Sequence, residues 1–532
     1  MARVEIYDTT LRDGAQGEGI SFSVEDKLKI AQRLDQMGFD YIEGGWPGSN
    51  PKDNEFFQRA QDIKWQNAKL SAFGSTRRVG IKANEDQNLQ TILATKVKVA
   101  AIVGKAWDFH VTNALQTTLE ENLDMVADSI AFLSAQGLEV IFDAEHFFDG
   151  YKHNPAYALE VLRVAAQAGA HVVVLCDTNG GSLPWEVEKA TKAAVGAVKV
   201  PVGIHVHNDA GLAVANSLVA VQAGSTHVQG TINGYGERCG NADLCSIIPN
   251  LQLKAGKSCL TEESLGQLTR LSNFVSEMAN QAPNDKQPFV GRSVFSHKGG
   301  LHVSALMRHP ETYEHVAPES VGNRRRVLVS ELSGVATIAY KAQEYDISLE
   351  QGTAGLRGVL EVIKDLEYQG YQFEGAEASF EIMLRKSLGL YSPFFQLEGL
   401  RVIIEKRHQE EEPITEATVK VRVNDQSLHT VAEGNGPVNA LDNALRKALE
   451  EVYPRLNQIW LTDYKVRVLN ERRGTGAKVR VLIESTDGTQ SWGTVGVSTN
   501  LIEASWRALV DSIEYGLMHT QRAYDAGVQI AP

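Results

Sequence analysis

The stretch AYALEVLRVAAQAGAHVVVLCD, residues 156–177, contains the unit from which the first half of the chain is built. Apolar side chains of its first part recur at helical spacing and fall on one side of a helix: Tyr157, Leu159, Val161, Leu162 and Ala165. A turn with a glycine then leads to the β-branched apolar run Val172–Asp177. The stretch therefore predicts a helix that is followed by a buried strand.

Eight such runs occur before residue 240, and helix-length segments lie between them. They are Val4–Asp8, Tyr41–Trp46, Lys69–Gly74, Val99–Gly104, Glu139–Ala144, Val172–Asp177, Val202–His207 and Val228–Ile232. Eight βα units in about 250 residues predict an α/β fold, a closed (β/α)8 TIM barrel. An open doubly wound sheet is the alternative, but it would normally carry a glycine-rich dinucleotide turn after its first strand. Here DTTLRDG, residues 8–14, stands at that position.

The remainder of the chain shows two kinds of sequence pattern. Residues 263–390 show a mostly helical pattern. In residues 391–532, polar and apolar residues alternate as they do in β-strands. When the sequence is aligned with itself at an offset of 60 residues, Val419 matches Val479 and Leu441 matches Leu501. The pattern therefore predicts two βββα copies in the last part of the chain. We expect three parts: a catalytic barrel over 1–262, helical subdomains over 263–390 and a duplicated domain over 391–532.

The composition excludes several classes of protein. Among 532 residues, 66 are acidic and 52 basic, a net charge of −14, which argues against a nucleic-acid or anionic-membrane binder. Apolar runs reach only about half a dozen residues, far below the ~20 of a membrane span, and no secretory signal is apparent at the N-terminus. Four cysteines without a CxxC motif form neither a disulfide framework nor a zinc ribbon, so a reduced cytoplasmic location is expected.

The sequence HVHND, residues 205–209, is the strongest chemical signal. Alternate residues of a strand project to the same side, so His205 and His207 present two imidazoles to one point. Asp13 follows the first strand, which closes the barrel near the seventh, and two imidazoles with a carboxylate are common ligands of a divalent cation. In isolation, the two histidines would more often be polar tips at a surface edge. The glycine-rich loop 234–241 either brings Asn241 as a fourth ligand or is a simple closing turn.

Other polar residues also follow predicted strands. Arg12 precedes Asp13, and its guanidinium suits a carboxylate-bearing substrate or an oxyanion; a surface ion pair explains it equally well. Glu145 ends the fifth run and Thr178 follows the sixth. Since catalytic groups of TIM barrels lie at the carboxyl ends of the strands, all three are expected at the mouth of the barrel.

Three motifs together carry a resemblance to a known family. DTTLRDGAQ (8–16), HVHND (205–209) and GYGERCGN (234–241) resemble the DRE-TIM metallolyase superfamily, in particular its Claisen-condensing branch of 2-isopropylmalate, homocitrate and citramalate synthases. FSHKGGLH (295–302) and TYE (312–314) resemble motifs of the helical subdomains in that branch. The pair of βββα copies at the C-terminal end, here called the C-terminal pair, resembles the LeuA-type allosteric dimerisation domain of that branch.

The resemblance implies a role for each matching position. A divalent metal, Zn, Mn or Mg, would be bound by Asp13, His205, His207 and Asn241. Arg12 and Thr178 would hold a 2-oxo acid, and Glu145 would take part in catalysis. His302 and Tyr313 of the helical subdomains would complete the active site across a homodimer and help to form the carbanion of the co-substrate acetyl-CoA. A histidine, or a water held by Glu145, would serve as the base.

Two further segments indicate which 2-oxo acid is the substrate. FGSTRR (73–78) and GKAWDFHV (104–111) are similar to one subgroup of citramalate synthases, and bulky Trp107 and Phe109 suit a small pocket. We therefore expect pyruvate and acetyl-CoA as substrates, (R)-citramalate as product and isoleucine as effector. The alternatives are a 2-isopropylmalate synthase, which uses 2-oxoisovalerate, and a non-catalytic amino-acid-sensing barrel. A retro-aldol lyase is disfavoured by the C-terminal pair.

Overall fold

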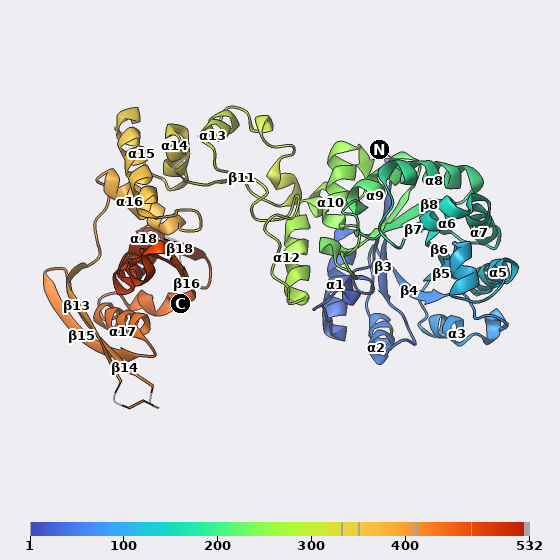
Figure 1. Cartoon of the computed structure of the whole chain (residues 1–532), viewed down its shortest axis with the longest axis horizontal. Helices are drawn as coiled ribbons and strands as arrows, with labels where there is room; N and C mark the ends of the chain where they lie inside the picture. Colours follow the sequence, from blue (N-terminus) through green and yellow to red (C-terminus); the bar gives the residue numbers. More distant parts are fainter. Residues whose placement is uncertain are drawn as a thin grey trace. The chain divides into compact units, whose positions relative to one another are not determined.

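The computed structural model describes residues 2–330, 333–348, 352–406, 408–409, 412–469 and 471–525. The chain divides into two compact units (Figure 1). The first comprises Met1–Phe295 and His315–Arg325, and the second comprises Ser296–Glu314 and Arg326–Pro532. Within the described part of the chain, no helix has the length and apolar character needed to cross a membrane.

Eight parallel strands of the first unit form a closed barrel, as the sequence predicts. They are β2 (Glu5–Asp8), β3 (Tyr41–Gly45), β4 (Lys69–Ser75), β5 (Val99–Lys105), β6 (Glu139–Glu145), β7 (Val172–Asp177), β8 (Val202–Val206) and β9 (His227–Gly230). The barrel closes where β9 pairs with β2, which sets Gln229 opposite Tyr7. This closure brings the first and last strands together, so residues about 220 positions apart in the sequence become neighbours.

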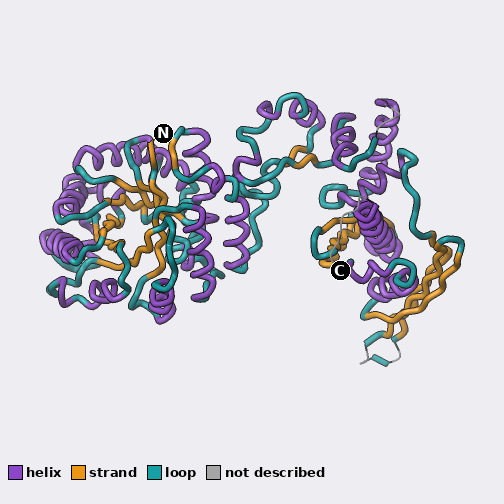
Figure 2. The backbone as a smooth tube through the Cα atoms, turned by 180° about the vertical axis from the view of Figure 1, so that it is seen from behind, coloured by secondary structure: helices purple, strands orange, loops and turns teal. Residues whose placement is uncertain are grey.

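Helices surround these strands, which Figure 2 shows in orange inside the purple ring. The helices of this ring are α1 (Val24–Met37), α2 (Pro51–Ala60), α3 (Gln87–Ala94), α4 (Asp108–Asn113), α5 (Leu119–Ala135), α6 (Phe147–His153), α7 (Pro155–Gln167), α8 (Pro184–Ala197), α9 (Ala213–Gln222) and α10 (Leu244–Pro249). Helix α7 begins one residue before its predicted start, because Asn154 caps it by accepting a hydrogen bond from the Tyr157 amide. Its residues Val161 and Leu162 are fully buried against the barrel.

Three predicted strands extend too far at their carboxyl ends. The run Tyr41–Trp46 stops as a strand at Gly45. The other two differ as follows. The run Val202–His207 stops as a strand at Val206, and His207 instead forms an isolated bridge with Asn241. The run Val228–Ile232 stops at Gly230, and a 3-10 turn over Ile232–Gly234 follows. In both places the chain leaves the barrel to form the loops at its mouth, and where the backbone pairing stops depends on the neighbouring strands and not on local residue type.

The first unit ends with β10 (Lys257–Ser258), which pairs with β1 (Ala2–Arg3), and with α11 (Glu262–Leu265) and α12 (Leu268–Met278). The second unit contains β11 (Ser296–His297), β12 (Arg326–Val327), α13 (Gly300–Leu306), α14 (Val335–Glu344), α15 (Gly352–Gln369) and α16 (Glu377–Ser387). Ile338, Ile363 and Phe380 form part of the buried core of the last three helices. The mostly helical pattern predicted for this stretch is thus confirmed.

The C-terminal part of the second unit is a repeated βββα pair, as the 60-residue shift predicts. The first copy is β13 (Gln396–Glu405), β14 (Ile414–Val423), β15 (Gln426–Gly434) and α17 (Pro437–Leu449). The second is β16 (Trp460–Val468), β17 (Val479–Thr486), β18 (Ser491–Ser498) and α18 (Leu501–Asp525). The central strands β14 and β17 carry Val419 and Val481 in one shared core.

Candidate active site

The four predicted metal ligands converge at the carboxyl end of the barrel. Asp13, His205, His207 and Asn241 are all buried, with exposed fractions between 2% and 8%. His205 Nε2 lies 3.5 Å from an Asp13 carboxylate oxygen, and the two imidazole centroids are 5.3 Å apart. The bridge between His207 and Asn241 adds the fourth residue to the group. Four residues that follow or end three different strands are therefore neighbours at this end of the barrel.

This donor set fits a divalent cation. His207 Nδ1 and Asn241 Oδ1 are buried without a hydrogen-bond partner, although buried polar atoms are normally paired. Carboxylate, imidazole and amide oxygen are ligands that Zn, Mn and Mg accept. Among the described residues, no three His, Cys, Asp or Glu side chains are arranged closely enough to hold a metal ion together. The Asp13 carboxylate is instead bound on both oxygens by Arg12, at 2.5 and 2.8 Å.

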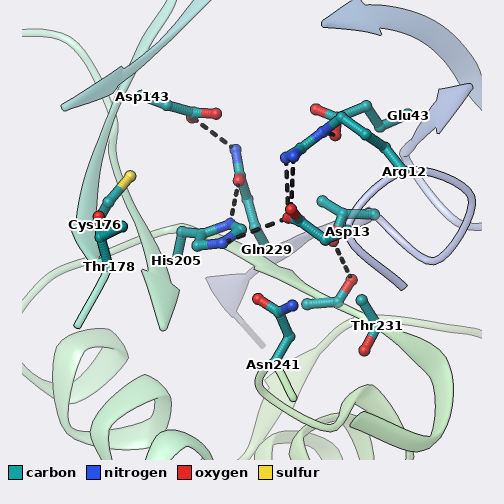
Figure 3. Close-up of polar contacts among 12 residues, drawn as sticks. Arg12, Asp13, Glu43, Asp143, Cys176, Thr178, His205, Gln229, Thr231 and Asn241 are labelled. Atoms are coloured by element: carbon teal, nitrogen blue, oxygen red, sulfur yellow. Dashed lines mark hydrogen bonds and ion pairs between the residues drawn. The ribbon is translucent and has the colours of Figure 1, made fainter. Parts of the chain in front are cut away.

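Arg12 lies in a buried ion-pair network and is not a surface residue. Its Nε donates to Glu43 on β3, which lies beside it in Figure 3. Glu43 accepts a second hydrogen bond from the Tyr7 hydroxyl at 2.6 Å. The guanidinium carbon lies 3.8 Å above the centre of the Phe73 ring. The alternative of a surface ion pair is therefore wrong. Glu43 was missed by the sequence analysis; its only signal is a charged residue inside an otherwise apolar strand.

The charges of this network shift its pKa values in opposite directions. Burial acts to raise the pKa of Asp13, but the positive charge of Arg12 and the neighbouring histidines outweigh it and hold the pKa below its ordinary value. Burial raises the pKa of Glu43 in spite of Arg12. For Arg12, burial acts to lower the pKa, and the charges of Asp13 and Glu43 raise it overall. The guanidinium thus stays charged beside the Asp13 carboxylate.

A second polar chain crosses the barrel interior behind His205. His205 Nδ1 lies 2.8 Å from Gln229 Oε1, and the Gln229 amide nitrogen donates to Asp143 at 3.0 Å (Figure 3). Gln229 is completely buried and Asp143 is 3% exposed. Burial, and then the charge of Glu43, raise the pKa of Asp143 well above its ordinary value. The sequence analysis missed both residues, because each strand carries a further polar residue and no local pattern marks these two as buried.

Glu145 and Thr178 lie at the same end of the barrel and contact neighbouring strand ends. Glu145 forms an ion pair with Lys105 at the end of β5. The Thr178 hydroxyl accepts a hydrogen bond from the His146 amide at 2.9 Å. Within the described part of the chain, neither side chain hydrogen-bonds to Arg12, Asp13 or His205. They are thus at the mouth, as predicted, but outside the ion-pair network.

Aromatic side chains follow β5 and β6 beside Glu145. The Trp107 ring stacks on His110 with centroids 5.1 Å apart, and His110 contacts the His146 ring at 4.1 Å. Trp107 Nε1 and His110 Nδ1 are buried without a hydrogen-bond partner. Phe109 is 51% exposed. Of the two bulky residues that were expected to narrow a substrate pocket, Trp107 is thus the one with buried ring contacts.

His302 and Tyr313 belong to the second unit. His302 lies on α13, and Tyr313 follows the 3-10 turn Pro310–Thr312. Their rings stack with centroids 4.1 Å apart and an interplanar angle of 26°. Both side chains are exposed. The two residues that the resemblance pairs are therefore in direct contact.

Comparisons with known proteins cover nearly the whole chain. The HMGL-like family matches residues 3–275, the homocitrate synthase post-HMGL domain-like family matches 289–370, and the LeuA allosteric (dimerisation) domain matches 374–517.

Three curated proteins are similar to this chain over almost their full lengths. The (R)-citramalate synthase of Geobacter sulfurreducens is 56% identical, over 97% of this chain and 98% of its own. That of Aquifex aeolicus is 55% identical over the same shares. A probable 2-isopropylmalate synthase of Methanopyrus kandleri is 31% identical, over 96% of this chain and 98% of its own. The chain therefore belongs to the HMGL-like family and, within it, to the group of (R)-citramalate synthases.

Proposed function

We propose that this enzyme condenses acetyl-CoA with pyruvate and hydrolyses the thioester, which yields (R)-citramalate and CoA. The observation that carries the proposal is the 48–56% identity, over almost the full length, to five (R)-citramalate synthases. The 2-isopropylmalate synthases are only 30–31% identical over similar lengths. Leucine biosynthesis is therefore the weaker alternative.

A divalent cation is proposed at Asp13, His205, His207 and Asn241. When bound, it would supply positive charge that polarises the keto group of the 2-oxo acid. The support is the proximity of these side chains at one end of the barrel. In addition, His207 Nδ1 and Asn241 Oδ1 are buried without a hydrogen-bond partner. A non-catalytic amino-acid-sensing barrel would not need this set of residues, so we do not favour that alternative.

Arg12 and Thr178 are proposed to hold the 2-oxo acid. A guanidinium binds a carboxylate through two parallel hydrogen bonds, and this fixes the orientation of the substrate as well as its position. Glu43 accepts a hydrogen bond from Arg12 Nε and is itself held by the Tyr7 hydroxyl, so the two residues orient the Arg12 side chain. Arg12 would therefore exchange part of its bonding to Asp13 for bonding to the substrate carboxylate.

The acetyl group must lose a methyl proton before it can attack. We propose that a base takes this proton and that the electron pair left on the methyl carbon then forms a bond to the keto carbon of pyruvate. The π electrons of the keto group move to its oxygen, which takes a proton and becomes the hydroxyl group of the product. Water finally cleaves the thioester, and CoA leaves. Glu145, alone or through a water, and His302 with Tyr313 are the proposed groups for proton transfer. Lys105 keeps Glu145 paired at the mouth of the barrel.

Regulation and assembly are proposed from the C-terminal part. The match to the LeuA allosteric (dimerisation) domain supports a homodimer and an amino-acid effector, for which we propose isoleucine. The four cysteines are all free, which agrees with the proposed cytoplasmic location.

A panel of 2-oxo acids tests the proposed reaction. Thiol release from acetyl-CoA is measured with pyruvate, with 2-oxoisovalerate and without an oxo acid. We expect release with pyruvate, and we expect EDTA to abolish it until a divalent cation is restored. Robust release with 2-oxoisovalerate and none with pyruvate would instead identify a 2-isopropylmalate synthase.

A further inference from the structure

A chain of two hydrogen bonds reaches His205 from the interior of the barrel. It joins Asp143 on β6 to Gln229 on β9, and Gln229 to His205 on β8. All three side chains are at least nine-tenths buried, at 3%, 0% and 6% exposure. Figure 3 shows the chain beside the Arg12–Asp13 pair. None of the proposed steps so far uses Gln229 or Asp143.

The direction of these bonds follows from the chemistry of the groups. The Gln229 amide nitrogen can only donate, and an Asp143 oxygen accepts from it whether the carboxyl group is ionised or neutral, because the carbonyl oxygen of an acid still accepts. This orientation turns the amide oxygen of Gln229 toward His205 Nδ1. An amide oxygen cannot donate, so the proton of this contact must be on Nδ1.

The location of that proton decides what the other ring nitrogen can do. A neutral imidazole carries one N–H, so a proton on Nδ1 leaves the lone pair of Nε2 free. His205 Nε2 is the atom that faces the Asp13 carboxylate, at 3.5 Å. The free lone pair is thus directed toward the group of predicted ligands. With the opposite tautomer, an N–H would point there and exclude a cation.

We infer that Gln229 and Asp143 are positioning residues that hold His205 in the tautomer able to bind a divalent cation. The inference rests on the metal site of the proposed function. Metal-binding histidines generally donate their second N–H to a fixed acceptor, which sets the ring orientation and the tautomer. Here the acceptor is a neutral amide, and Asp143 in turn prevents that amide from rotating. Neither residue touches the substrate.

The test is the affinity for Mn²⁺ of the metal-stripped full-length protein, read from the electron paramagnetic resonance signal of free Mn²⁺. Gln229→Met keeps the side-chain volume and removes the acceptor, so the affinity should fall about 10- to 100-fold. In the double variant Asp143→Asn with Gln229→Glu, the amide at position 143 donates and the carboxylate at position 229 accepts, so the hydrogen bond between these two positions is kept in the reverse direction. The second carboxylate oxygen at position 229 still faces His205. The affinity of the double variant should return to within about threefold of the unaltered protein, by the same reasoning.

Controls separate this inference from the metal site itself. Gln222→Leu, at an exposed position of α9, should leave Mn²⁺ binding unchanged. If Gln229→Met folds and binds Mn²⁺ as tightly as the unaltered protein, the inference is overturned while the site stands. If Gln229→Met does not fold, Asp143→Ala replaces it, because it frees the amide to rotate; unchanged affinity there also overturns the inference. Full Mn²⁺ affinity in His207→Ala would contradict the metal site, and the oxo-acid panel tests the reaction independently.

Discussion

Arg12 is the residue on which the polar contacts of the active site depend. Its guanidinium is shared between Asp13 and Glu43, and its flat face lies on Phe73. Two carboxylates around one guanidinium leave the group with a net negative charge, which suits the binding of a cation. Because Glu43 holds the Nε side, the two terminal nitrogens remain directed at the Asp13 carboxylate. The position of Arg12 thus depends on Glu43, a fully buried residue.

Glu43→Gln tests this dependence. The amide keeps the shape of the side chain and removes the charge that holds Arg12, so the guanidinium is less well oriented toward the carboxylate of pyruvate. A misplacement of about 1 Å costs roughly 100-fold in rate, and we expect a loss of that order in kcat/KM for pyruvate. Steady-state thiol release measures it. An unchanged kcat/KM would contradict the role of Glu43, and the melting temperature serves as the control for folding.

Helix α18 illustrates how a whole element carries a titratable group into a core. Glu514 lies in the middle of this helix, 2% exposed, and accepts hydrogen bonds from the Phe394 amide at 3.0 and 3.2 Å. Burial raises its pKa to about 7, although the backbone amide acts to lower it. The helix therefore holds its carboxyl group against the segment that precedes β13.

The stability of the protein should depend on pH through this group. The folded-state pKa of Glu514, about 7, lies above the ordinary value of 4.5, so the folded state binds the proton more tightly than the unfolded state. The stabilisation is complete below pH 4.5 and is lost as the pH rises to about 7, a contribution of about 3 kcal/mol. Glu514→Gln should reduce this loss.

Urea unfolding of both proteins between pH 5 and 8 measures the difference. The unaltered protein should lose more unfolding free energy than Glu514→Gln across this range. Parallel pH profiles for the two proteins would contradict the prediction.

At the scale of the molecule, each unit has a hydrophobic core of its own. One core surrounds the barrel strands, and separate cores lie under the helices α14–α16 and within the βββα pair. A ligand that binds the C-terminal pair therefore stabilises that unit directly. Any effect of such a ligand on catalysis must be transmitted as a coupling free energy between distinct sites.

Isoleucine should raise the melting temperature and inhibit thiol release in the same concentration range. The physical reason is linkage: at 100 times its Kd, a ligand specific for the folded state adds about 2.7 kcal/mol. Differential scanning fluorimetry and the thiol assay, each with leucine and threonine as controls, measure both effects. If none of the three amino acids changes either quantity, the proposed regulation is wrong.

Sequence patterns predicted the larger features correctly. The eight strands, the βββα repeat and the convergence of His205 and His207 all follow from local periodicity, since helices and strands impose fixed spacings on apolar residues. Strand ends were less accurate, as His207 shows, because the end of backbone pairing is set by the neighbouring strands and not by the local residue pattern.

The sequence by itself therefore determined the barrel, the repeat and the group of polar residues at the strand ends. Only the tertiary structure decided what lies behind that group: Glu43 on Arg12, and Asp143 and Gln229 on His205. Each of these is a buried polar residue of a barrel strand, and Asp143 and Gln229 are 86 positions apart. No local pattern links such residues, because their contact arises only when the strands close into a barrel.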